Sequence, residues 1–243
     1  LPILYHFKKT IRKPTPIHHK INAFRSLFDG IDVACLQEYY LTNETTTGPL
    51  DLHLDLASVC PSEKLDWSNA TALYGTQSHL ANAIFITRDM VKIGEEQNSV
   101  PSADNVPRCY ASVTLQIKDK PVKIASIHLT GGRFDDVNAI QDESGKYIDT
   151  KYDQIRDLVE KNSPDIICGD FNTKYRSPDV LESTNAYFNL LTLLLPNMDE
   201  NTKEEYRNRW EEWIYMDRIH AYLTDNGYRS VFNANTTIKD TSA

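Results

Sequence analysis

The sequence predicts an α/β protein in which sheets pack together and helices cover them. Short apolar segments of strand length, such as residues 31–36 and 165–168, favour strands that are covered on both faces. Alternating apolar residues on both sides of a short polar turn, within 112–129, predict a hairpin. Apolar residues at helical spacing, within 152–159, predict an amphipathic helix between strands. This mixture of elements suits packed sheets with helices outside.

Length and composition fit one globular domain over residues 1–243. The chain is 40% hydrophobic and 25% charged, which leaves enough apolar material for a sizeable core. No apolar run is long enough to cross a membrane, and nothing indicates an obligate oligomer. The net charge of −8 disfavours strong non-specific binding to duplex DNA, because that binding needs clustered Lys and Arg. It does not exclude a nuclease, since a bound divalent cation adds positive charge at the reacting phosphate.

The four cysteines contain no C-x-x-C pair, which argues against structural zinc. Cys35 and Cys168 lie in apolar segments, where a reduced and buried thiol is expected. We therefore expect no disulfide framework and an intracellular location, cytoplasmic or nuclear.

The first half of the chain is expected to begin with a helix that Thr15-Pro16 starts and Gly30 ends. Further elements are predicted along this half: a strand at 31–36, loops and short helices at 42–72, a strand at 83–87 and an extended loop at 94–107.

The second half begins with the hairpin, whose turn is Lys118-Asp119-Lys120. The helix through 152–159 should end near Asn162-Ser163-Pro164. The strand at 165–168 follows, and then helical segments at 187–195 and 206–223.

Polar residues follow three of the predicted strands. Glu38 follows the strand at 31–36, His128 follows the return strand of the hairpin, and Asp170 and Asn172 follow the strand at 165–168. Strand ends hold side chains rigidly beside open loops, so reactive groups are often found there. Each motif alone is weak, and packing explains most isolated examples. All three in this order are hard to explain by packing.

These motifs resemble the endonuclease/exonuclease/phosphatase superfamily, whose fold is that of DNase I. The resemblance rests on four segments: Leu36-Gln37-Glu38, residues 82–88, Ile127-His128-Leu129 and Gly169-Asp170-Phe171-Asn172. It implies a four-layer sandwich of two mixed β-sheets flanked by helices. It also implies a divalent metal, usually Mg²⁺, with Mn²⁺ as an alternative.

The resemblance also implies roles for individual residues. Glu38 matches the metal-binding glutamate, and Asp170 matches the aspartate that serves the water nucleophile or the leaving group. Asn172 matches the asparagine that contacts the phosphate, and His128 matches the histidine after the hairpin strand. Candidate substrate-binding residues are Asn82, within the 82–88 segment, and Arg133, in the loop after His128.

Two features depart from the family pattern. No strand ending in Asn occurs before Thr15, and no Ser-Asp-His segment occurs before Ala243. We therefore expect a domain that is incomplete at both ends and is inactive in this form. Asp217-Arg218-Ile219-His220 does not replace the missing motif, because it falls in a helical stripe and is expected on a helix surface.

The function predicted for the parent protein is Mg²⁺-dependent phosphoester hydrolysis, as a phosphodiesterase or nuclease. Its substrate would be a nucleic acid, a nucleotide or another phosphoester. Two alternatives remain: a catalytically silent relative that acts as a binding module, and a phosphatase or phospholipase that acts on a phospho-head-group. Beside these two, the chain could also be a globular domain in which the motifs are accidental.

Overall fold

The computed structural model describes residues 28, 30–42, 54–64, 78–102, 108–131, 137–174, 199–215 and 217–230, with isolated residues between 182 and 193. Its elements are, in chain order, β1 Val33–Thr42, β2 Leu54–Lys64, β3 Ser78–Thr87, β4 Val91–Val100, β5 Arg108–Ile117, β6 Lys120–His128, α4 Val137–Asn162, β7 Ile166–Asp170, α6 Glu200–Ile214 and α7 Asp217–Asp225. The predicted helix before Gly30 and the segment 187–195 lie wholly or mainly outside the described residues.

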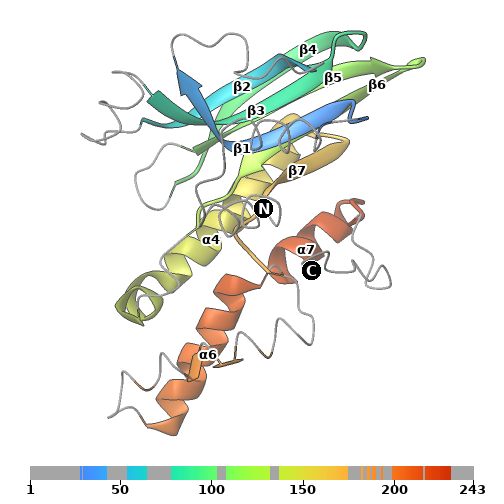
Figure 1. Ribbon diagram of the computed structural model, residues 1–243. Helices are drawn as coiled ribbons and strands as arrows, with labels where there is room; N and C mark the ends of the chain where they lie inside the picture. The colour runs from blue at the N-terminus through green and yellow to red at the C-terminus, as the bar shows by residue number, and fades with distance from the viewer. Residues whose placement is uncertain are drawn as a thin grey trace.

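Two sheets form the centre of the fold. The three-stranded sheet has the order β1-β3-β2 and is antiparallel, whereas the four-stranded sheet has the order β4-β5-β6-β7. Among the described strands, β6 and β7 alone pair in parallel, so the second sheet is mixed. Helix α4 lies beneath the four-stranded sheet (Figure 1). Helices α6 and α7 lie on the same side, away from the three-stranded sheet (Figure 1). The predicted α/β class with packed sheets and outer helices is confirmed.

Alternation along β5 and β6 divides the apolar side chains between two layers. Ala111, Val113 and Leu115 face the three-stranded sheet and pack with Ile84 and Ile86 of β3. On the other face of the same sheet, a second cluster packs against α4 and α7; its buried members include Tyr110, Ile127, Leu129, Ile155, Leu158 and Ile219. Because side chains alternate in a strand, β5 and β6 each contribute to both layers.

The hairpin and the helix that follows it agree with their predictions. β5 pairs with β6 in register from Tyr110 opposite Ile127 to Ile117 opposite Lys120, and Lys118-Asp119 forms the turn. α4 ends at Asn162, as expected.

Three local predictions are wrong. Strand β2 lies within the predicted loop region 42–72, and β4 occupies much of the predicted loop 94–107. β4 escaped prediction because it is exposed along nearly its whole length and so has no apolar alternation. The helical stripe at 206–223 is two helices, α6 and α7, which are separated at Tyr215.

A disulfide joins Cys60 of β2 to Cys109 of β5, and it therefore links the two sheets. The expectation that the chain has no disulfide framework is contradicted by this pair, and the argument for an intracellular location loses its basis. Cys35 and Cys168 are free thiols, as predicted, but they are half-buried rather than buried. Among the described helices, none has the length and apolarity needed to cross a membrane.

Candidate active site

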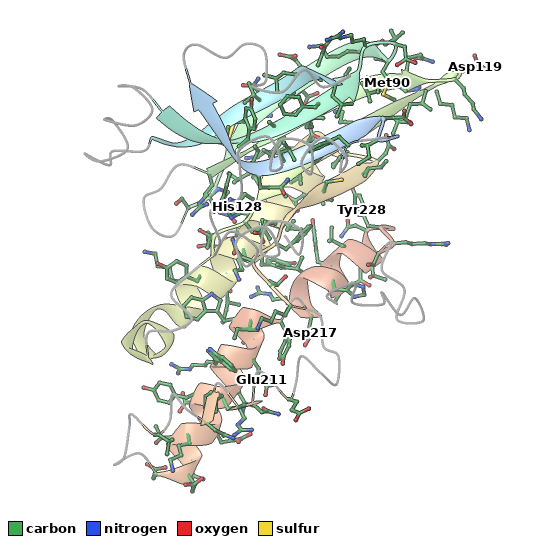
Figure 2. The ribbon with its side chains drawn as sticks, in the orientation of Figure 1. Met90, Asp119, His128, Glu211, Asp217 and Tyr228 are labelled. Atoms are coloured by element: carbon green, nitrogen blue, oxygen red, sulfur yellow. A yellow bond between two sulfur atoms is a disulfide. The ribbon has the colours of Figure 1, made fainter. Side chains whose placement is uncertain are left out.

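The ends of β6 and β7 place two predicted site residues side by side. His128 and Asp170 are register partners in these parallel strands, and the Leu129 amide donates to the Asp170 carbonyl oxygen at 2.9 Å. His128 lies at the opposite end of the sheet from Asp119 in the hairpin turn (Figure 2). The adjacency of the I-H-L and G-D-F-N motifs follows from this pairing, although about 40 residues separate them in sequence.

An irregularity in β1 positions Glu38. The register between β1 and β3 shifts between Leu36 and Tyr39, and Glu38 there has a φ of 53°. Gln37 is buried, and its Nε2 donates to Ser126 Oγ in β6 at 2.9 Å, whereas Glu38 is exposed. Bulges redirect side chains in this way and are frequent beside active sites. Glu38 thus lies inside a longer strand than predicted, and the bulge rather than the strand end exposes it.

The pKa of His128 depends on the charged groups around this site. Burial lowers the pKa of His128 below its ordinary value, and the positive charge of Arg108 lowers it further. The carboxylates of Asp170 and Glu38 act in the opposite direction on the same pKa. Both predicted carboxylates therefore lie close enough to His128 to influence its proton. A lowered pKa keeps the imidazole neutral at pH 7, with one N–H available as a donor.

The G-D-F-N segment forms a tight turn after β7. Asn172 has a φ of 48°, and its backbone N–H donates to Asp170 Oδ1 at 2.8 Å. Its side-chain Nδ2 donates to the carbonyl oxygen of Leu129 at 2.7 Å, which ties the turn to the end of β6. Phe171 points away and packs against the cluster beneath the sheet. Asn tolerates this left-handed backbone conformation better than most residues, so the choice of Asn has a structural cause as well.

Gly169 permits the close pairing of β7 with β6. A Cβ at this position would overlap the backbone carbonyl oxygen of Ile127. The group that approaches Gly169 is thus the backbone of the neighbouring strand.

One residue that the sequence did not single out, Lys151, supports the turn from behind. Lys151 of α4 is 2% exposed, and its Nζ donates to the carbonyl oxygens of Asn172 at 2.7 Å and Trp213 at 3.2 Å. Burial lowers the pKa of Lys151 to about 7, although the negative charge of Asp170 opposes this shift. A lysine within an amphipathic helix gave no sign of burial in the sequence.

Trp213 of α6 supports the loop that follows His128. Its Nε1 donates to the carbonyl oxygen of Gly131 at 3.1 Å, and its ring stacks on Tyr147 of α4. Trp213 falls in the helical segment predicted at 206–223, but no pattern in the sequence indicates this contact. Arg108, at the start of β5, was also missed, because no local motif marks it.

Other predicted residues lie apart from this arrangement. Asn82 is 1% exposed in β3, where its Nδ2 donates to the carbonyl oxygen of Cys109 at 2.7 Å. This position gives Asn82 a role in packing between the sheets, and its substrate-binding role stays a prediction. Arg133 lies outside the described residues. His220 is exposed on α7, as predicted for a helix-surface residue.

The oxygen and nitrogen side chains of the site can be compared with the ligands that Mg²⁺ requires. Among the described residues, no group of three or more His, Cys, Asp or Glu side chains is placed to hold an ion. Mg²⁺ does not require such a cage, because it keeps several waters and is commonly bound through one or two carboxylates. An exposed carboxylate at Glu38, close enough to influence His128, fits that requirement.

Comparison with known proteins found similar structures but no matching sequence: no family model and no curated protein matches the chain. The human Nocturnin catalytic domain with bound sulfate is 17% identical, with a TM-score of 0.43 over 70% of this chain and 62% of that one. An endonuclease/exonuclease/phosphatase family protein from Leptotrichia buccalis C-1013-b is 15% identical, with a TM-score of 0.41 over 72% of this chain and 66% of that one. Truncated TDP2 from Caenorhabditis elegans is 15% identical, with a TM-score of 0.39 over 66% of this chain and 60% of that one. The chain thus spans less than two thirds of each of these structures.

Proposed function

We propose that this chain belongs to the endonuclease/exonuclease/phosphatase superfamily and that its parent protein hydrolyses a phosphoester. The observation that supports this proposal comes from the chain itself. Glu38, His128 and the Asp170–Asn172 turn lie on three separate segments, yet they lie close together: His128 and Asp170 are register partners, Asn172 donates to Leu129, and the charge of Glu38 acts on His128. These are the positions whose motifs resemble that superfamily.

Each of these side chains has a chemical task in the proposed reaction. Asp170 would accept a proton from the attacking water, as a positioned carboxylate can. The neutral His128 would donate its N–H to a phosphoryl oxygen as negative charge develops there. Asn172 gives one amide hydrogen to Leu129, and the second remains to contact the phosphate.

We further propose that Glu38 holds a Mg²⁺ ion, for which Mn²⁺ could substitute. When bound, the ion would polarise a phosphoryl oxygen and offset charge in the transition state. The substrate class that we propose is a nucleic acid or nucleotide phosphodiester, as the resemblance of these motifs to that superfamily implies.

A substrate screen on the parent protein tests the activity. Phosphodiester and phosphomonoester substrates would be assayed with Mg²⁺ or Mn²⁺ and again with a chelator. We expect metal-dependent hydrolysis that Asp170→Asn reduces by at least ~100-fold, in the range found for loss of an acid–base group. The matched control is Asp225→Asn at the exposed end of α7, which should keep the full rate. A lack of turnover of every substrate by folded parent protein would support the binding-module alternative.

Titration calorimetry tests the metal site separately. Glu38→Gln should weaken Mg²⁺ binding and leave the fold unchanged, because the side chain is exposed. Glu160→Gln, on the exposed face of α4, is the control and should bind Mg²⁺ as the unmodified chain does. Unchanged Mg²⁺ affinity in Glu38→Gln would remove Glu38 as a ligand.

A further inference from the structure

Two free thiols meet between the sheets, next to the candidate active site. Cys35 is in β1 and Cys168 is in β7, and their side chains share a hydrogen bond. A separate contact supports this placement. Gln37, two residues after Cys35 on the same face of β1, donates to Ser126 Oγ, and Ser126 is the register partner of Cys168. The inner faces of β1, β6 and β7 are therefore in direct contact here.

The two thiols differ in their tendency to lose a proton. The hydrogen bond from Cys35 stabilises the thiolate of Cys168 and lowers the pKa of Cys168. The same bond, together with burial, raises the pKa of Cys35. Cys168 is thus the nucleophile of the pair, since the thiolate is the reactive form. Both side chains are half-buried, so neither is sealed from small molecules.

The fold already contains a disulfide between the same two sheets. Cys60 of β2 and Cys109 of β5 are joined, whereas Cys35 and Cys168 are not. The intersheet space therefore accommodates a disulfide at one position and presents a second pair of thiols at another.

We propose that Cys35 and Cys168 form an oxidation site, which a small-molecule disulfide such as glutathione disulfide converts into a cross-sheet bond between β1 and β7. The Cys168 thiolate attacks one sulfur of the reagent, whose S–S bond breaks and releases one glutathione thiolate. That thiolate takes up a proton from solvent. Cys35 then loses its proton and attacks the Cys168 sulfur of the mixed disulfide, which releases the second glutathione. Two protein thiols are oxidised, and one reagent disulfide is reduced to two thiols.

The proposed disulfide would join the two strands that carry residues of the candidate active site. Glu38 follows Cys35 by three residues in β1, and Asp170 follows Cys168 by two in β7. A covalent bond between these strands would fix the distance between the segments that hold the two carboxylates. The oxidation itself requires neither carboxylate, so it can be tested without any assumption about catalysis.

Peptide mapping of the whole chain tests the proposal. The protein would be incubated with glutathione disulfide near pH 8, quenched in acid, alkylated and digested without reductant. We expect one new cross-linked pair, formed by the peptides of Cys35 and Cys168, with the loss of two hydrogens in mass. Dithiothreitol should reverse it under conditions that leave the folded chain intact, and the Cys60–Cys109 pair should be present before and after oxidation.

Two variants identify the order of attack. Cys35→Ser should retain glutathione on Cys168, because the second attack is blocked. Cys168→Ser should form no cross-link and should gain far less glutathione on Cys35. The proposal is overturned if the unmodified chain keeps both thiols, if it keeps glutathione on Cys168 without a cross-link, or if either cysteine pairs instead with Cys60 or Cys109. Because these outcomes are read from the unmodified chain, a variant that fails to fold does not prevent the test.

Discussion

Replacement of Lys151 by Met should change how stability depends on pH. Lys151 is buried, and its folded pKa is about 7, compared with an ordinary value of 10.5. In the unfolded chain the side chain returns to water and keeps its proton up to that ordinary pKa. Between these two pH values the unfolded state therefore binds one more proton than the folded state. Met fills a similar volume but cannot titrate.

The sign and size of the effect follow from proton linkage. Stability rises with pH wherever the unfolded state holds more protons, by about 1.4 kcal/mol per pH unit for one proton. For Lys151 this contribution is fully present above pH 10.5 and is lost as the pH falls through about 7. From roughly pH 7.5 to roughly pH 9.5, the free energy of unfolding of the unmodified chain should therefore rise by about 2 kcal/mol more than that of Lys151→Met.

Urea unfolding, followed by tryptophan fluorescence in a chelating buffer, measures this difference. Groups that titrate in both proteins cancel when the two profiles are subtracted. Lys146→Met, at an exposed position of α4, is the matched control and should run parallel to the unmodified chain. Parallel profiles for Lys151→Met as well would refute the reasoning, because they would mean that Lys151 keeps its proton among the carbonyls of Asn172 and Trp213.

Other substitutions test the turn, the histidine and the strand contact. Asn172→Ala should lower the free energy of unfolding by about 1–2 kcal/mol, because an amide hydrogen bond and a tolerant backbone residue are lost. It should also cut the phosphoesterase rate of the parent protein per folded molecule by more than about tenfold; an unchanged rate would leave Asn172 with a turn role alone. His128→Gln should flatten the acid side of the melting-temperature profile. The pKa of His128 is lowered by burial, so its contribution is present above its ordinary value and is lost as the pH falls through the folded pKa. Gly169→Ala should destabilise the chain by about 3 kcal/mol or more in urea unfolding, because its Cβ would overlap backbone. Gly145→Ala, which meets open space in α4, should stabilise it by up to about 1 kcal/mol.

The sequence predicted best the elements whose cause is local. The hairpin alternates along β5 and β6, and a polar turn lies between them, so both its existence and its turn were recoverable. The end of α4 was recoverable for the same reason, because Asn162-Ser163-Pro164 interrupts the helix within a few residues. β2 was not recoverable, since shifts in its register at two places break the alternation that identifies a strand.

The candidate site was predictable in its motifs but not in its support. His128 and Asp170 each follow an apolar strand, and the pairing of these strands makes them neighbours. Arg108, Lys151 and Trp213 act through contacts between residues far apart in sequence, and no local pattern distinguishes them from ordinary surface or core positions. The disulfide was missed for the same reason, because spacing alone does not show that Cys60 and Cys109 face each other.

The supporting contacts explain how a short strand at the edge of a sheet can hold a site rigidly. β7 has only five residues and pairs with one described strand, β6. The turn after it is nevertheless fixed on two sides: Asn172 donates to the end of β6, and Lys151 donates to the backbone of Asn172 from below. Since Lys151 also binds Trp213 of α6, whose ring nitrogen donates to the loop after His128, α4 and α6 join both active-site segments. The helices beneath the sheet thus position the site as much as the strands that carry its residues. A substitution at Lys151 should therefore alter the positions of both His128 and Asp170.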